Sequence, residues 1–430
     1  MQQVHAVVDL RAVPQRQARD RVWAFSAIAI GTFMTSLDGS STAAILPAIG
    51  RGFASPIATL EWVLTANLLV LSACLLAAGW WADTRGHERA YVVGLTVFVG
   101  GSALCATMPS VATLIAARIV QAIGSAMILA TSPTLLMRLY PASQRGRALG
   151  LHVAVNYLAL TVGPWVGGWL TDAYSWRLAF LVNLPLGFAA CALSINGLQR
   201  TAPILRRRRF DVGGGILFGG ALTVFLLALN QVRHQTVSVS AVVMLAVSAL
   251  ALLMFAGVES RTQHPLLDLR LFARPPFTIA VCSLVFAYLC LQAATFALPF
   301  YLIQSRGLTV VHAAVLMSIR PAVTACVAPI GGRLGDRLPV AVIGGIGIAS
   351  LCAGALLIAR LDAEASLAHV SAALVVMALG MAALLAPAQS ALIGAAQAPN
   401  QGVAAGVMNM ARTIGMALGV GIGRIVVLRS

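Results

Sequence analysis

Charge is scarce in this 430-residue chain, and lysine is absent from it. Only 10% of the residues are charged, whereas about a quarter are charged in a typical soluble domain. Hydrophobic residues make up 59%, and apolar runs of about twenty residues recur along the chain. The alternating short segments of an outer-membrane barrel are missing. The composition therefore excludes an ordinary soluble domain and indicates a helical integral membrane protein.

Several motifs are also missing. The seven cysteines lie singly in apolar runs, without a CxxC pair or a Cys/His cluster, which argues against a disulfide framework or a zinc site. Neither a nucleotide-binding loop nor a group of metal ligands occurs, so we expect no enzyme, no bound metal and no cofactor. The first 22 residues lack the apolar core and cleavage site of a signal peptide. We therefore expect the first apolar run to remain as a span.

Arginine supplies all of the basic charge, and the formal net charge is +16. The arginines are spread over short loops rather than gathered on one face, which argues against a nucleic-acid partner. If the N-terminus is cytoplasmic, 19 of the 29 lie in inner segments and 7 in outer segments. Because cytoplasmic loops are enriched in basic residues, we expect a cytoplasmic N-terminus in the cell membrane.

The apolar runs predict thirteen spans and four regions. The regions are a cytoplasmic tail at 1–21, a six-helix bundle at 22–197, a linker with two extra spans at 198–276, and an incomplete five-helix bundle at 277–430. The predicted spans are 22–47, 60–82, 89–108, 111–137, 148–171, 178–197, 211–229, 238–258, 277–302, 311–334, 340–359, 367–393 and 403–427.

An internal repeat relates the two bundles. "GWWAD" at 79–83 and "GRLGD" at 332–336 are offset by 336 − 83 = 253 residues. Four glycines recur at an offset of 256, namely Gly146, Gly150, Gly163 and Gly167 against Gly402, Gly406, Gly419 and Gly423. On this offset the counterpart of the sixth span would begin near residue 432 (176 + 256). We therefore expect a fourteenth helix that has been lost or lies outside this sequence.

The loop "GWWADTRGHER" at 79–89 resembles the signature between spans two and three of the major facilitator superfamily, roughly G-x-L-x-D-R-x-G-R-[RK]. Trp81, Thr84 and the pair His87-Glu88 depart from that pattern. The alternative is a plain polar turn. The resemblance implies a gate on the cytoplasmic side that works by charge pairing. It assigns to this gate Gly79, Asp83, Arg85, Gly86 and Arg89, with Asp336 and Arg337 in the second copy.

Two further segments resemble motifs of the same superfamily. "LIAARIVQAIGSA" at 114–126 is similar to its span-four motif, in which the arginine, here Arg118, is tied to proton coupling. An intramembrane arginine requires a counter-charge or a wet cavity. "LALTVGPWVGG" at 158–168 resembles the Gly-Pro signature of exporting antiporters, although helix packing alone would also explain it. Its hinge residues are Gly163, Pro164, Gly167 and Gly168.

"LDGSSTAAILPAI" at 37–49 resembles the span-one signature of the fourteen-span drug:proton antiporter branch. It carries Asp38 inside an apolar run, about sixteen residues and roughly 24 Å from the inner end of the span. Arg118 is expected at a similar depth. Burial favours the neutral form of a carboxyl group and a nearby cation favours the ionised form, so an acid that alternates between the two can carry a proton. The alternatives are a structural ion pair or a cap at Gly39.

Four residues form a weaker prediction for a substrate cavity: Gln121, Tyr157, Phe296 and Arg320. The aromatic residues of this set could equally pack between helices or face lipid. Arg320 departs from the apolar residue usual in the branch, so it either faces the cavity and disfavours cations or extends toward the interface.

The resemblance as a whole implies an all-α integral membrane protein, a two-bundle transporter of major-facilitator type with about 13 transmembrane helices. It implies proton-coupled antiport that exports a lipophilic small molecule, with the proton as coupling ion and the lipid bilayer and substrate as partners of a monomer. The alternatives are a non-transporting receptor, scaffold or truncated remnant of the same fold, and uptake of a metabolite.

Overall fold

The computed structural model describes residues 18–198, 211–231, 239–262, 265–361, 365–396 and 400–429, so most of the expected tail at 1–21 and part of the linker lie outside it. The described residues form helices and turns without a β-strand. The helices are α1 (Ala18–Phe53), α2 (Ile57–Arg85), α3 (His87–Thr107), α4 (Val111–Leu139), η2 (Ala142–Gln144), α5 (Arg145–Ala173), α6 (Leu178–Leu181), α7 (Asn183–Gly197), α8 (Val212–Gln231), α9 (Val239–Arg261), η3 (Leu269–Ala273), α10 (Pro275–Phe300), η4 (Tyr301–Ser305), α11 (Val310–Arg337), α12 (Val340–Ala359), α13 (Leu367–Ala395) and α14 (Gln401–Arg429).

Within this part of the chain, twelve helical segments are long and apolar enough to cross a membrane, and α8 adds a shorter apolar segment at 213–228. Each coincides with one of the thirteen predicted spans. The protein is therefore a multi-pass membrane protein. The sixth span is divided into α6 and α7 at Val182. Pro185 lacks the N–H that would bond the carbonyl of Leu181 in a continuous helix, which accounts for the break.

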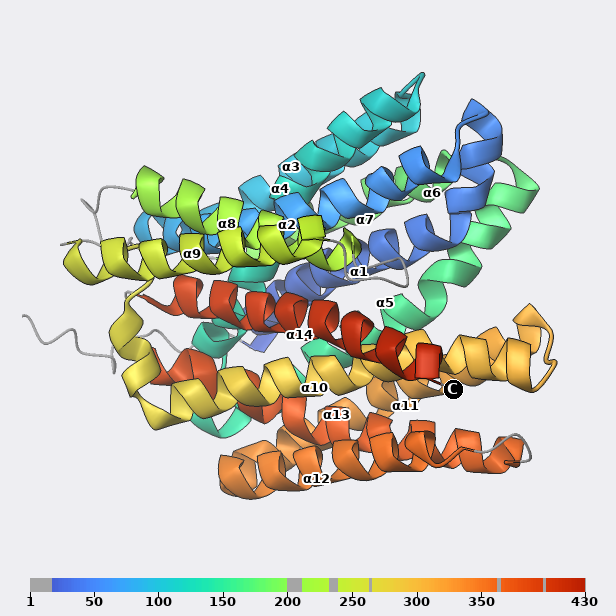
Figure 1. Cartoon of the computed structure of the whole chain (residues 1–430). Helices are drawn as coiled ribbons and strands as arrows, with labels where there is room; N and C mark the ends of the chain where they lie inside the picture. Colours follow the sequence, from blue (N-terminus) through green and yellow to red (C-terminus); the bar gives the residue numbers. More distant parts are fainter. Residues whose placement is uncertain are drawn as a thin grey trace, which may run out of the picture.

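The helices form two groups that meet along four helices (Figure 1). In the first group α1 packs on α5 and α7, and α4 packs on α2 and α3; in the second, α14 packs on α10, and α13 packs on α11 and α12. Contacts between the groups run mainly through α2 with α14 and α5 with α11. The two extra helices, α8 and α9, pack on each other, and α8 also contacts α2. A small set of helices thus joins the two groups.

Glycine pairs bring the two groups into backbone contact at the end of the molecule where α1 begins, which we call the inner end. A methyl group added at Gly79 of α2 would overlap the carbonyl oxygen of Gly402 of α14. Likewise, a methyl group added at Gly146 of α5 would overlap the carbonyl oxygen of Gly332 of α11. Small residues permit such close helix approach, and the two contacts are related by the repeat offsets.

Candidate functional site

A buried ion pair joins α1 to α4. The Nη1 atom of Arg118 donates a hydrogen bond of 2.5 Å to Oδ2 of Asp38. The exposed fractions of these residues are 1% for Arg118 and 4% for Asp38. The ring of Phe180 lies 5.7 Å from the guanidinium carbon. The structure therefore brings together the two residues for which the sequence predicts a common depth, and it encloses them.

Three more polar residues complete this network, and all are buried. Gln121 donates to Oδ1 of Asp38 at 2.9 Å, and Asn183 donates to the same oxygen at 3.0 Å. Gln121 also donates to the hydroxyl of Ser102 at 2.6 Å, and it accepts a hydrogen bond from Arg118. Every oxygen of the Asp38 carboxylate thus has a donor, as a buried charge requires.

The backbone explains why these side chains converge. Arg118 and Gln121 are three residues apart on α4 and therefore share one face of that helix. Ser102 comes from α3, which packs on α4. Asn183 is the first residue of α7, which packs on α1 and α3, so its amide lies in the interior of the bundle.

Two carboxylates link the groups at the inner end. Each accepts hydrogen bonds from the first turn of a helix in the opposite group. Asp83 of α2 accepts hydrogen bonds from the backbone N–H groups of Gly402 at 2.9 Å and Val403 at 3.1 Å. These N–H groups belong to the first turn of α14, where a helix has no internal acceptors for them. The carboxylate also meets the positive end of the helix dipole. We call this contact the first clamp.

The second clamp has the same geometry. Asp336 of α11 accepts hydrogen bonds from the N–H groups of Gly146 at 2.7 Å and Arg147 at 2.9 Å, in the first turn of α5. Asp336 follows Asp83 of the first clamp by 336 − 83 = 253 residues. The donor Gly146 precedes the donor Gly402 of the first clamp by 402 − 146 = 256 residues. The sequence repeat is therefore also a repeat of inter-bundle contacts.

The rest of the predicted gating loop surrounds the first clamp. Gly86 adopts a φ of 102° between α2 and α3, which favours glycine. The ring of His87 lies 3.0 Å from Oδ1 of Asp83. The basic residues Arg85 and Arg89 are exposed, as is Arg337 at the second clamp. In this conformation the carboxylates bind helix termini, and the arginines face outward.

The predicted hinge residues of α5 have two different settings. Gly163 and Gly167 pack on α1, where the hydroxyl of Ser41 donates to the carbonyl of Gly163 at 2.7 Å. Pro164 is exposed, and a methyl group at Gly168 would meet nothing within 4 Å. One face of this segment of α5 therefore packs on α1, and the opposite face makes no close contact with another described helix.

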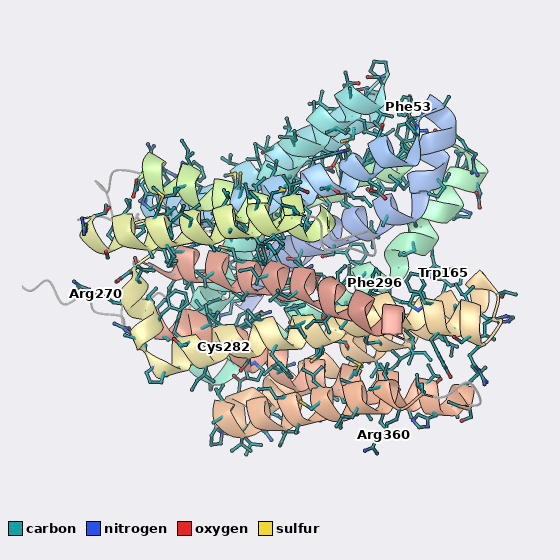
Figure 2. All side chains as sticks on the ribbon, viewed as in Figure 1. Phe53, Trp165, Arg270, Cys282, Phe296 and Arg360 are labelled. Carbon is teal, nitrogen blue, oxygen red and sulfur yellow. The ribbon has the colours of Figure 1, made fainter. Side chains whose placement is uncertain are left out.

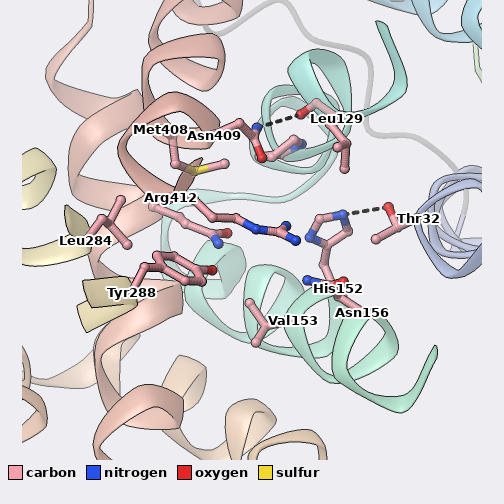
Figure 3. Close-up of a pocket in the computed structure, with 12 residues that line it drawn as sticks. Thr32, Leu129, His152, Val153, Asn156, Leu284, Tyr288, Met408, Asn409 and Arg412 are labelled. Carbon is pink, nitrogen blue, oxygen red and sulfur yellow. Dashed lines mark hydrogen bonds between the residues drawn. The ribbon is translucent and has the colours of Figure 1, made fainter. Parts of the chain in front are cut away.

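A small central cavity of about 30 Å³ lies between the two groups (Figure 3). This volume holds little more than a water molecule or two. Its walls come from α1, α4, α5, α10, α13 and α14. The residues that line it are Thr32, Leu129, Pro133, His152, Val153, Asn156, Leu284, Tyr288, Gln389, Met408, Asn409 and Arg412.

None of the four residues of the weaker cavity prediction is among those that line this cavity. Tyr157 is buried beside Tyr288, with Arg320 and Arg412 as charged neighbours. Gln121 instead belongs to the Asp38 network, because its face of α4 is turned toward α1 and α3 rather than toward the second group. Phe296 packs with its ring 5.4 Å from that of Phe300 and is not part of the cavity wall.

Sequence reasoning missed Ser102 and Asn183 in the network and His152 in the cavity. A polar side chain in an otherwise apolar run was the available signal in each case. For Asn183 the run is "LAFLVNLPLG" and for His152 it is "LGLHVAV". Serine is common in membrane-spanning helices, so Ser102 had no distinctive sequence signal.

Two bundles of spanning helices around a small central cavity are the arrangement of a membrane transporter, and the family and relatives that match this chain are transporters rather than enzymes. The chain belongs to the Major Facilitator Superfamily, which matches residues 28–420.

Among curated proteins, the chain is 31% identical over 393 residues to the riboflavin transporter RibZ of Clostridioides difficile, covering 91% of this chain and 85% of that one. It is 30% identical over 414 residues to the multidrug resistance protein Stp of Mycobacterium tuberculosis, covering 93% and 75%. Among solved structures, the human organic anion transporter MFSD10 matches with a TM-score of 0.66 at 15% identity, covering 96% of this chain and 94% of that one. This last likeness concerns the fold alone.

Proposed function

We propose that the protein is a proton-coupled antiporter that exports lipophilic small molecules across the cytoplasmic membrane. In this proposal the N-terminus is cytoplasmic, the inner end faces the cytoplasm, and Asp38 carries the proton. The relatives include a multidrug resistance protein as well as a riboflavin transporter, so relatedness supports transport of small organic molecules. The proton rests on the site itself, and the direction rests on the resemblance of residues 158–168 to the signature of exporting antiporters.

The observation that carries the proposal is the enclosed pair of Asp38 and Arg118. Among the described residues, Asp38 is the one carboxylate near the middle of a spanning helix, since the other acids lie near helix ends. A charge at that depth is costly unless it is paired, and such residues mark ion and proton pathways. Structure alone does not require an acid there, because an apolar residue would avoid the cost of desolvation.

Protonation of Asp38 would change the balance of the network. The neutral acid no longer compensates the charge of Arg118, so the arginine gains by moving toward water or another acceptor. Because α1 packs on α5 and α4 packs on α2, a shift at the pair reaches the two helices that make most of the contact with the second group. Proton entry at a membrane potential of 100 mV supplies about 2.3 kcal/mol per charge.

The clamps supply the gate in this scheme. Both lie at the inner end, so breaking them allows the two groups to rock apart there and open the central cavity to the cytoplasm. At the other end of α5, Trp165 is 70% exposed (Figure 2). The close backbone contacts between the groups, at Gly79 with Gly402 and at Gly146 with Gly332, lie at the inner end in this conformation.

Transport of a dye into inside-out vesicles tests the proposal. A pH gradient, acidic inside, should drive accumulation of a lipophilic fluorescent dye by vesicles that contain the protein. Vesicles that contain Asp38→Asn should show no gradient-driven accumulation. A wild type that moves no dye of a broad panel would favour a receptor or scaffold with this fold, and a variant that accumulates dye as the wild type does would refute the role of Asp38.

A further inference from the structure

The described wall of the central cavity contains a basic residue without an acidic residue to balance it, and the proton site does not supply one. Arg412 lines the cavity together with His152, whereas no aspartate or glutamate is among the described residues of the wall. The only acid that the structure places deep inside a spanning helix of the described chain is Asp38, and Arg118 already holds it. The cavity therefore presents positive charge without a carboxylate of its own.

The setting of Arg412 leaves its guanidinium free to bind a ligand. Its carbon atom Cζ lies 5.8 Å from the centre of the Tyr288 ring, and the group extends across the cavity toward the ring of His152 (Figure 3). His152 is anchored on the far side by a 2.8 Å hydrogen bond to Thr32. In the part of the chain that the structure describes, Arg412 forms no ion pair. A group placed between Arg412 and His152 would meet the guanidinium donors on one side and the imidazole ring on the other.

A second arginine reinforces the same region from α11. Arg320 and Arg412 are both charged neighbours of Tyr157, which is buried beside the cavity residue Tyr288. The Nη1 atom of Arg320 is buried and has no hydrogen-bond partner within the described chain. A buried donor of a charged group without an acceptor is unfavourable, whereas the Nη1 atom of Arg118 has Asp38 and Gln121 as acceptors. Two arginines near one cavity thus lack the anion that Arg118 has.

The other residues of the cavity wall indicate the chemical character of a ligand that would supply this anion. Leu129, Val153, Leu284 and Met408 are apolar, and Tyr288 offers an aromatic face. The Oε1 atom of Gln389 is buried without a donor, so it can accept one hydrogen bond from a ligand. An aromatic body, an anionic group and an O–H or N–H donor would satisfy all three features.

We propose that the central cavity binds organic anions, namely aromatic molecules that carry a carboxylate or phenolate. This inference rests on the proposed function in that it takes the central cavity to be the substrate site. At about 30 Å³ the cavity is closed around these groups, so the ligand enters when the two bundles separate. Lipophilic cations should be poor ligands, because two guanidinium groups repel them and no carboxylate of the wall attracts them.

Binding of two xanthene dyes to the purified protein in detergent tests the proposal. Fluorescein is anionic and has a phenolic hydroxyl, while tetramethylrhodamine methyl ester has the same ring system with a positive charge. The wild type should bind fluorescein at least about tenfold more tightly than the rhodamine ester. Arg412→Gln should weaken fluorescein binding by a similar factor, and Arg412→Lys by less, because it keeps the charge.

Arg360→Gln is the matched control, because Arg360 is exposed at the end of α12, away from the cavity (Figure 2). It should bind fluorescein as the wild type does. Equal or tighter binding of the rhodamine ester by the wild type, or unchanged fluorescein binding by a folded Arg412→Gln, would overturn the inference. If Arg412→Gln does not fold, the dye preference of the wild type decides. The assay uses no gradient, so a failure of proton coupling leaves its result unaffected.

Discussion

Asp38 and Arg118 are separated by 80 residues of sequence, yet Oδ2 of the first lies 2.5 Å from Nη1 of the second in the interior of the first bundle. The amides of Gln121 and Asn183 occupy the other carboxylate oxygen. The network thus holds the side chain of an acid from two helices, and it ties the protonation of that acid to the positions of α4 and α7.

Removing one partner of the pair should destabilise the protein more than removing both. Arg118→Gln leaves the carboxylate of Asp38 buried without its cation and should cost about 3–5 kcal/mol. In the double variant Asp38→Asn/Arg118→Gln neither charge remains, so most of that loss should be recovered. Thermal unfolding in detergent measures the cycle. Additive effects of the two substitutions would contradict the description of the pair as mutually compensating.

Asn183 should matter for stability although its sequence signal is slight. Asn183→Leu removes the 3.0 Å hydrogen bond to Asp38 and its contact with Ser102. We expect a loss of about 1–3 kcal/mol, because a buried carboxylate oxygen loses a donor. Asn196→Leu on the same helix is the control, since Asn196 is exposed and its amide bonds only the backbone of its own helix. Equal unfolding temperatures for the two variants would show that the amide of Asn183 adds nothing.

The clamps should hold the inner end closed. Asp83→Asn and Asp336→Asn each remove a charge from a helix terminus, which is worth about 0.3–2 kcal/mol per helix. The double variant should therefore populate conformations in which the inner end is open. Spin labels at the exposed positions Arg89 and Arg333, on a cysteine-free background, report the distance between the bundles there. An unchanged distance distribution in the double variant would mean that the glycine contacts suffice.

The close approach of α2 and α14 gives an independent test of the same end. Gly402→Ala places a methyl group against the carbonyl of Gly79 and the carboxylate of Asp83, so it should weaken the first clamp at a cost of about 1–3 kcal/mol. Gly421→Ala on the same helix meets nothing within 4 Å and should be neutral or slightly stabilising. The inner-end distance and the unfolding temperature distinguish them. Similar behaviour of the two variants would contradict the packing described here.

Much of this arrangement can be predicted from the sequence, because the membrane restricts the length and composition of each span. Apolar length predicts each span, and an acid or an arginine inside a span stands out, as Asp38 and Arg118 do. The repeat offset of Asp83 and Asp336 predicts that the two are equivalent. It does not reveal that their partners are helix N-termini, because backbone N–H groups have no sequence signature.

Other features depend on the packing of helices that are remote in sequence. The amide of Asn183 reaches the network because α7 packs on α1 and α3. Gln121 looks like a cavity residue from its place on α4, but the rotation of that helix in the bundle turns it toward Asp38. Helical periodicity gives the relative direction of side chains on one helix, and only the packing of neighbours gives the absolute one.

The most direct test of the central claim is to measure protons moved by a substrate gradient in proteoliposomes that enclose a pH-sensitive dye. With the wild type, a gradient of a transported substrate should drive protons in the opposite direction without any imposed pH difference. With Asp38→Asn, exchange of labelled for unlabelled substrate should continue while the proton signal disappears. Proton movement by Asp38→Asn at the wild-type rate would contradict the account.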